Sequence, residues 1–402
     1  MKKQWGGLLT FVLIAVFSIP AAGQQQAPAA DAGQASGQAP AAAPSAPAPL
    51  PTPSMTAPLS TAAPPHTFNA GPFGTVAITG ILSGIGLTQS NWIPGDKPTH
   101  WDLSNGQIFL QKTSGWFQFY LQAGAYDLPA LGAPYFTAVD TVKGLYGPLP
   151  VGYVKLVKGN FNAEIGELPT LIGAEYTFTF ENMNVERGLL WGQETAISRG
   201  IQVSDTFKKL SLTASWNDGF YSNVYNWISG SAAYAFNSSN TLSFVAAGNA
   251  GETTSTGLAT PFLQNNGQIY NILYTFTHES LTITPYWQYT RVPANAKLGI
   301  PTTGSTDGGA LLLNYNFKHG ISLAARPEYI TSKGLNLLFL GTGSSAFGIT
   351  FTPTYQKAGF FLRGDVSIVD ARNLTAPDAF AFGALGTNSK QVRGVVEAGF
   401  MF

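Results

Sequence analysis

Apolar and polar residues alternate along most of the chain after residue 73, in runs of about 8–12 residues. In the run from Leu281 to Arg291, the odd positions hold leucine, isoleucine, proline, tryptophan and tyrosine, whereas the even positions are mostly threonine and glutamine. The same two-sided pattern recurs at residues 210–216, 347–356 and 360–368. Because successive side chains of a strand point to opposite faces, each run predicts a strand with one apolar and one polar face.

Short turns and long polar connections alternate between these runs. The turns fall near residues 113, 158, 208, 238, 278, 318 and 357, and the strands begin near residues 75, 106, 115, 150, 160, 197, 210, 227, 240, 268, 281, 308, 321, 346, 359 and 392. This layout predicts an all-β fold, a transmembrane antiparallel up-and-down β-barrel of about 16 strands, and counts from 14 to 18 fit the same pattern. We expect the short turns on the periplasmic side and the long loops outside the cell.

The last run, Val392 to Phe402, places Arg393 and Glu397 on the face opposite its apolar residues. A charge that faces lipid costs roughly 2–4 kcal/mol near the midplane, so we expect both to face the lumen. Apolar residues at alternate positions before a terminal Phe are typical of the strand that the bacterial outer-membrane assembly machinery recognises. We therefore predict Phe400 and Phe402 as an assembly signal, with that machinery and outer-membrane lipid as partners. Aromatic residues that fit girdles at the lipid–water interface are Trp116, Trp216, Trp227, Trp287 and Tyr289.

The N-terminal part of the chain differs from the rest. Lys2 and Lys3 precede an apolar run from Leu8 to Ile19 and small residues up to Gly23, which predicts a secretory signal peptide over residues 1–23. Residues 24–72 are mostly Ala, Pro, Gln, Gly and Ser, and so little apolar mass predicts a disordered periplasmic tether. The predicted domains are thus 1–23, 24–72 and a barrel over 73–402, in the bacterial outer membrane.

Composition agrees with a lipid-embedded barrel. Charged residues make up 10% of the chain, against about 25% in ordinary soluble domains. The formal net charge is zero, which gives no indication of a nucleic-acid partner. Cysteine is absent and the four histidines are scattered over the tether, a loop and two turns, so we predict no metal site and no cofactor.

Barrels of 16 to 18 strands leave an aqueous channel. The third long connection, Leu168 to Ala196, is too rich in aromatic and apolar residues for plain disorder, and we expect it to fold into the lumen and narrow the pore. Its predicted constriction residues, with one residue just after it, are Glu175, Glu181, Glu186, Arg187, Glu194 and Arg199. The charges predicted to face the lumen are Lys155, Glu164, Arg326, Glu328, Arg363, Asp365, Arg393 and Glu397. Because these charges nearly cancel, we predict passive diffusion of small polar or weakly charged solutes.

The stretch from Gly173 to Phe207, followed by a strand, a turn and a strand to Trp216-Asn217-Asp218-Gly219, resembles the putative beta-barrel porin-2 family, also called OmpL-like. The resemblance covers most of the chain after about Phe73. It implies a bacterial outer-membrane protein with a porin-like role, and it supplies no substrate and no site residue. By analogy with other 16-stranded porins, a homotrimer is a further expectation.

Two other functions fit parts of the sequence. His278 and Ser280 superficially resemble the His-x-Ser arrangement of outer-membrane phospholipases, but they occupy a tight turn on the predicted periplasmic side, where such residues are usually polar turn residues. We therefore expect no catalytic residue and no enzyme. A closed structural or adhesive barrel, sealed by its outer loops, remains the main alternative to a pore.

Overall fold

The computed structural model describes residues 59, 60, 65–338, 340–374 and 381–402. The predicted signal peptide, residues 1–23, and most of the predicted tether, residues 24–72, lie outside the described residues. Within the described part of the chain, no helix is long and apolar enough to cross a membrane.

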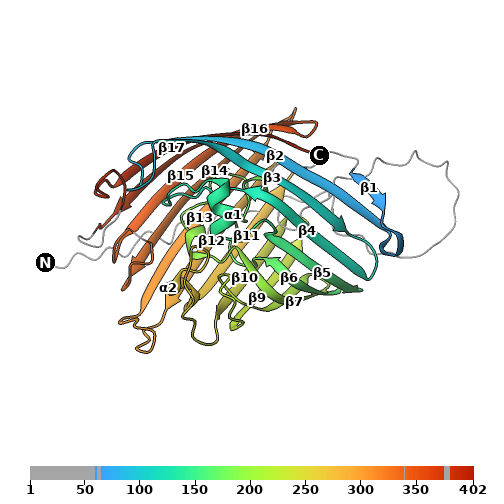
Figure 1. The fold of residues 1–402 in the computed structure, drawn as a ribbon, viewed down its shortest axis with the longest axis horizontal. Helices are drawn as coiled ribbons and strands as arrows, with labels where there is room; N and C mark the ends of the chain where they lie inside the picture. The colour runs from blue at the N-terminus through green and yellow to red at the C-terminus, as the bar shows by residue number, and fades with distance from the viewer. Residues whose placement is uncertain (1–58, 61–64, 339, 375–380) are drawn as a thin grey trace. The chain divides into compact units, whose positions relative to one another are not determined.

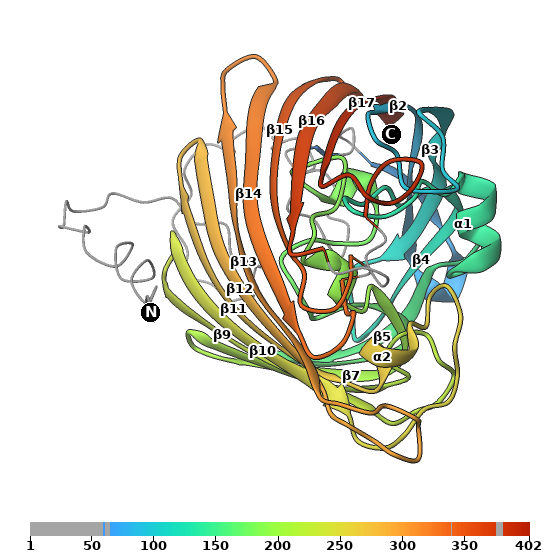
Figure 2. The same cartoon turned by 90° about the vertical axis from the view of Figure 1, so that its left-hand side faces the viewer.

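Strands β2 to β17 form a closed antiparallel barrel of 16 strands, in which each strand pairs with its neighbours along the chain (Figures 1 and 2). Pairing of β17 with β2, from Arg393↔Gln89 to Met401↔Ile81, closes the ring. The strands are β2 (Thr75–Gln89), β3 (Thr99–Lys112), β4 (Phe117–Tyr126), β5 (Val151–Lys158), β6 (Phe161–Pro169), β7 (Ile197–Phe207), β8 (Leu210–Asn217), β9 (Trp227–Asn237), β10 (Asn240–Asn249), β11 (Gln268–His278), β12 (Leu281–Val292), β13 (Gly304–Asn316), β14 (Ile321–Lys333), β15 (Ser345–Lys357), β16 (Phe360–Arg372) and β17 (Lys390–Met401). Closure leaves no unpaired sheet edge to face hydrocarbon.

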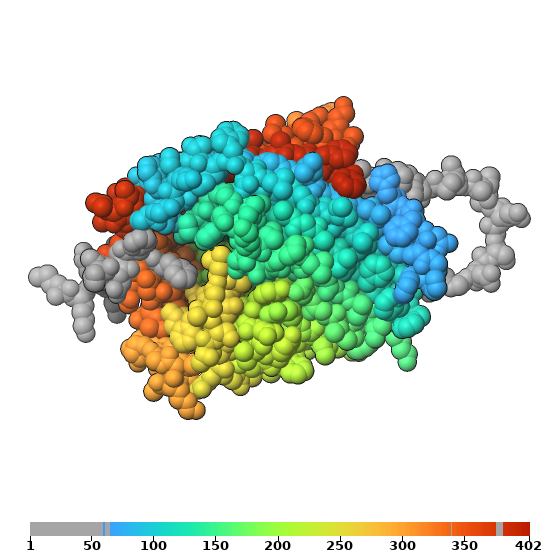
Figure 3. All heavy atoms as spheres, viewed as in Figure 1, coloured from blue at the N-terminus to red at the C-terminus, as the bar shows by residue number. Residues whose placement is uncertain are grey.

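Burial follows the predicted alternation. In β17, Val392, Val396 and Phe400 are exposed, whereas Arg393 and Glu397 between them are buried. The apolar face therefore points outward and the polar face inward, as the two-residue period predicts. The side chains of β2 to β5 and helix α1 (Ala138–Gly144) form a continuous outer surface in Figure 3.

One predicted girdle residue lies on the opposite face. Trp227 is only 1% exposed and packs inside the barrel against Phe220, with ring centroids 5.5 Å apart. Trp227, Ser229 and Ser231 are alternate residues of β9, so their side chains share the inward face of the strand. The prediction for Trp227 was wrong because proximity to a strand end does not fix the face, whereas Trp116 and Trp216 are 72% and 55% exposed.

Part of the predicted tether is ordered. The short strand β1 (His66–Asn69) pairs with Thr75–Ile78 of β2, and the 3-10 helix η1 (Gly71–Phe73) connects the two strands. This part of β2 extends past the end of β17, where Phe402 and Gly80 each donate a backbone N–H to the other's carbonyl at 3.0 Å. β1 thus covers an edge of β2 that would otherwise be unpaired.

Connections of two different lengths lie at the two ends of the barrel. Short turns such as Lys208-Lys209 and Ser238-Ser239 join strands at one end, as predicted. Longer connections at the other end contain α1, α2 (Phe262–Asn265) and the 3-10 helices η2 (Thr179–Glu181) and η3 (Trp191–Gln193). The long connections are therefore gathered where the candidate site lies.

Candidate functional site

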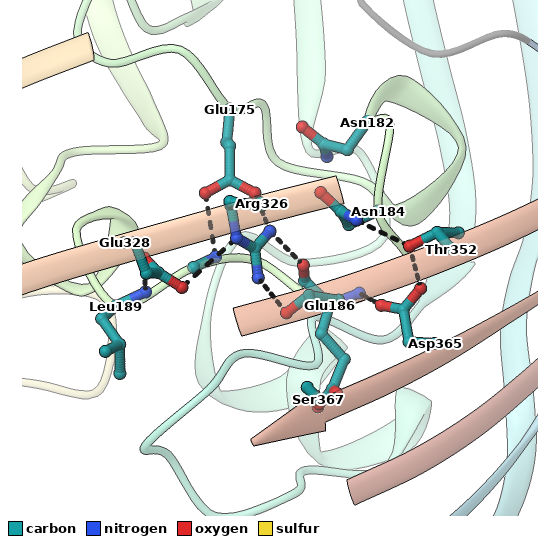
Figure 4. Close-up of polar contacts among 12 residues, drawn as sticks. Glu175, Asn182, Asn184, Glu186, Leu189, Arg326, Glu328, Thr352, Asp365 and Ser367 are labelled. Carbon is teal, nitrogen blue, oxygen red and sulfur yellow. Dashed lines mark hydrogen bonds and ion pairs between the residues drawn. The ribbon is translucent and has the colours of Figure 1, made fainter. Parts of the chain in front are cut away.

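The third long connection, residues 170–196 between β6 and β7 and called the third loop below, is mostly buried. Figure 2 shows this green segment inside the ring of strands. Because the third loop is buried and not exposed to solvent, its polar groups need hydrogen-bond partners within the protein. Many of these partners come from the inward faces of β14, β15 and β16 (Figure 4). Others come from β17, β11 and β12.

Arg326 on β14 joins the wall to the third loop. Its guanidinium donates to the carboxylates of Glu175 and Glu328 and, at 2.7 Å, to the backbone carbonyl of Glu186. The two carboxylates in turn accept loop amides, Glu175 from Gly188 at 2.9 Å and Glu328 from Leu189 at 2.7 Å (Figure 4). The cluster therefore places one buried cation beside two buried carboxylates, each of which also accepts a loop amide, and these contacts offset part of the cost of burial.

Glu186 makes a second junction with the wall. Its backbone N–H donates to Asp365 of β16 at 2.8 Å, and its carboxylate accepts from Ser367 at 2.8 Å (Figure 4). The same carboxylate accepts from Arg393 of β17 at 3.1 Å. Arg393 also donates to the carbonyls of Ala130 and Ala133 at 2.8 and 2.6 Å. One wall arginine thus holds both the third loop and the connection between β4 and β5.

Arg363 and Glu397 form a third junction, near η2. Their side chains pair at 3.1 Å, and Arg363 donates to the loop carbonyls of Asn182 and Thr179 at 2.9 and 3.0 Å. Glu397 accepts from the Thr179 hydroxyl at 2.8 Å and from Ser104 at 2.9 Å. All six predicted lumen charges of β14, β16 and β17 are therefore buried in contacts with the third loop or with one another.

The other charged residues of the third loop are buried with fewer ionic contacts. Glu181 accepts the backbone N–H of Phe178 at 2.9 Å, and burial raises the pKa of its carboxyl to about 8. Arg187 lies with its guanidinium carbon 5.6 Å from the ring centroid of Trp191, and burial lowers its pKa to about 10. Glu194 accepts from the hydroxyl of Tyr286 on β12, and burial raises the pKa of Glu194 well above its usual range.

Three predicted site residues lie apart from this group. Arg199 on β7 pairs with Asp218 at 2.8 Å and stacks on Tyr221 at 3.9 Å. Arg199 and the outward-facing Ile201 are two residues apart on β7, so their side chains share the outer face of the strand and Arg199 is directed away from the third loop. Lys155 and Glu164 pair with each other at 2.9 Å across β5 and β6.

Apolar residues of the connection between β14 and β15 pack against the third loop, a contact that was not predicted from the sequence. Leu337, Leu338 and Leu340, in the connection between β14 and β15, are buried, and the Leu337 carbonyl accepts from Gln193 of the third loop at 2.9 Å. Leu338 and Leu340 belong to one apolar cluster with Leu190. The signal was present in the sequence, because a leucine-rich run is unusual in a connection that should face water.

The third loop leaves a cavity of about 390 Å³ on the side of the opposite wall, β9 to β13. Its lining combines small, hydroxyl-bearing and apolar side chains: Leu171, Gly173, Ala174, Tyr176, Met183, Ser231, Ala233, Ser243, Val245, Leu273, Thr275, Thr282, Thr284 and Leu312. None of these residues is charged. The lumen is therefore divided into a charged side, occupied by the loop contacts, and an uncharged side.

No arrangement typical of a catalytic or metal site appears among the described residues. His278 is exposed at the end of β11, with its Nε2 3.9 Å from Glu279. Across the residues with described positions, no group of three or more His, Cys, Asp or Glu side chains could hold a metal ion.

Comparison with known proteins agrees with this geometry. The family described as putative beta-barrel porin-2, OmpL-like, matches residues 75–402. No curated protein matches the chain. Family and fold together indicate a porin-like barrel of the bacterial outer membrane.

Solved structures share the fold at low sequence identity. An anion-selective porin from Comamonas acidovorans superposes with a TM-score of 0.57 at 12% identity, over 81% of this chain and 99% of that chain. OmpT of Vibrio cholerae superposes with a TM-score of 0.55 at 11% identity, over 84% of this chain and 100% of that chain. The outer-membrane channel DcaP of Acinetobacter baumannii superposes with a TM-score of 0.53 at 9% identity, over 81% of this chain and 97% of that chain. The barrel is porin-like, and the chain belongs to the putative beta-barrel porin-2, OmpL-like family.

Proposed function

We propose that the chain is an outer-membrane porin through which small polar solutes diffuse passively, and that the third loop narrows its water-filled lumen. The observation that carries this proposal is the cavity of about 390 Å³ that remains beside β9 to β13 while the third loop is held to the opposite wall. A closed barrel of 16 strands is wide enough for an aqueous channel. The family and the porin neighbours support the same function.

In this proposal the charged residues act through the third loop. Glu175, Glu186 and Glu194 fix the loop to the wall through Arg326, Arg393 and Tyr286. Glu181 and Arg187 contribute to the same constriction, whereas Arg199 holds Asp218 at the outer end of β7. Phe400 and Phe402, whose rings stack with centroids 6.3 Å apart, are proposed as the assembly signal.

Swelling of proteoliposomes tests the porin function. Vesicles that contain the purified full-length protein should swell in isosmotic arabinose and swell more slowly in the larger raffinose, because a narrowed pore sieves by size. Vesicles without protein are the control. Absence of swelling in either sugar would contradict a porin.

The second candidate is a closed structural barrel. The packing of Leu338 and Leu340 with Leu190 of the third loop favours it, because these side chains exclude water from part of the lumen. It predicts no permeation by any small solute, so the same swelling assay separates the two functions.

The assembly state is a separate part of the proposal. We propose a homotrimer, for which the support is the fold shared with a V. cholerae OmpT structure described as a trimer form. Light scattering of the detergent-solubilised protein should give three times the mass of the chain. A monomer mass would reject the trimer and leave the pore proposal unchanged.

A further inference from the structure

Charged side chains are absent from the inward faces of six consecutive strands, β8 to β13. Strands β8, β9 and β10 contain no Lys, Arg, Asp or Glu. In β11 to β13, the one histidine and the two charged residues, His278, Arg291 and Asp307, lie exposed on the outward face. Six consecutive strands therefore present an uncharged surface to the lumen, whereas β14, β16 and β17 carry six inward charges.

The backbone of the third loop separates these two sets of strands. Glu175 points to Arg326 on the charged wall, while its neighbours Ala174 and Tyr176 line the cavity on the other side. The loop thus turns Glu175 and Glu186 toward the charged wall and presents uncharged side chains to the cavity, while Glu194 accepts from the hydroxyl of Tyr286 on β12.

The cavity has the chemistry of a site for uncharged molecules. An ion that loses water in a narrow space needs opposite charges to replace its hydration, and the lining offers none. Its hydroxyl groups, including those of Ser243 and Thr284, can both donate and accept hydrogen bonds, as the hydroxyls of a neutral solute require. Met183 and Leu312 supply apolar contact area.

We propose that this cavity is the selective passage of the channel, and that it admits uncharged hydroxylated solutes and disfavours ions. The inference rests on the proposed porin function. It also assigns a different role to the charged residues, which hold the third loop and do not contact the solute.

Three solutes with the same six-carbon frame test the inference. Proteoliposomes of the full-length protein are diluted into isosmotic glucose, sodium gluconate or glucosamine hydrochloride, and we expect glucose to enter about tenfold faster than either charged solute. Equal rates for all three would overturn the inference and leave the porin function intact. No entry by any of them would overturn the porin function and the inference with it.

Substitutions at Ser243 test whether solutes pass this cavity. Ser243→Asp should raise glucosamine entry relative to gluconate, and Ser243→Lys should do the reverse, because each places one charge on the lining. Ser243→Asn is the matched control, since it adds the bulk of Asp without its charge and should leave the glucosamine-to-gluconate ratio unchanged. Ratios that are the same in all three variants would show that solutes take another path, against the proposal.

Discussion

The guanidinium of Arg326 shows how single residues hold the candidate constriction. It is fully buried and contacts Glu175, Glu328 and the carbonyl of Glu186, and each of these contacts replaces part of its lost hydration. Removal of one partner from such a group leaves the others buried and uncompensated. Removal of one partner of Arg326 should therefore lower the stability of the fold more than removal of an exposed ion pair of the same wall.

We expect Arg326→Met to destabilise the folded protein by about 3–5 kcal/mol and to loosen the third loop, because it leaves the buried carboxylates of Glu175 and Glu328 without their cation. Arg372→Met is the matched control, because the Arg372 side chain is 66% exposed and pairs with Asp370 at the surface, where such pairs contribute about 0–1 kcal/mol. Urea unfolding and the rate of proteolysis within residues 170–196 measure the two effects. Equal behaviour of the two variants would contradict the role of Arg326.

The carboxyl of Glu181 gives the third loop a pH dependence. Burial raises its pKa from 4.5 to about 8, so the fold favours the neutral form. This contribution to stability is complete below the ordinary pKa and is lost as the pH rises through about 8. We expect proteolysis of the loop to accelerate over this window, and Glu181→Gln, which stays neutral, to reduce the acceleration. An unchanged pH profile in the variant would argue against Glu181 as the source.

At the scale of elements, the third loop depends on a left-handed backbone at its start. Gly173 has a φ of +85°, and a Cβ there would collide with the carboxylate of Glu194. A left-handed conformation costs roughly 1–2 kcal/mol for a residue with a side chain. Gly192, in the same loop, has no heavy atom within 4 Å of the position its Cβ would take.

We expect Gly173→Ala to shift Glu194 away from Tyr286 and to loosen the loop, whereas Gly192→Ala should behave like the natural chain. Protease protection of residues 170–196 and thermal unfolding measure both variants. Similar protection in the two variants would show that the loop tolerates a different path at Gly173.

The elements themselves were largely predictable from the sequence. Strand starts such as Ile197, Leu210 and Leu281 agree with the prediction, because the two-residue period and the polar turns mark them locally. Strand β1 was not predicted, because His66–Asn69 gain order from the uncovered edge of β2 and not from their own pattern. The inward packing of the Leu337 region was also missed, because it depends on the third loop as a partner.

The partners of the site residues could not be predicted in the same way. Parity placed Arg326, Arg363 and Arg393 inside the barrel, but the contact of Arg326 with Glu175 joins residues 151 positions apart. Register across many strands decides such a pair, and no local pattern records it. Arg199 was grouped with the third loop by proximity in sequence, whereas its side chain pairs with Asp218 elsewhere.

At the scale of the whole molecule, the barrel combines near neutrality with a strong internal division. The predicted lumen charges nearly cancel, yet those of β14, β16 and β17 lie on one wall and are buried beneath the third loop. The opposite wall carries hydroxyl and apolar groups around the cavity of about 390 Å³. The near balance of the predicted lumen charges thus does not describe the surface that a solute meets at the cavity.

The central claim is that solutes pass while the third loop stays fixed to the β14–β17 wall. Asn184 of the loop donates to Thr352 of β15 at 2.6 Å. Because the chain has no cysteine, a disulfide formed within the variant Asn184→Cys with Thr352→Cys can only join these two positions. Single-channel conductance of this variant, before and after addition of a reductant, is the most direct measurement. We predict the same open-channel conductance in both states, whereas a channel that is silent when oxidised and conducts when reduced would contradict the account.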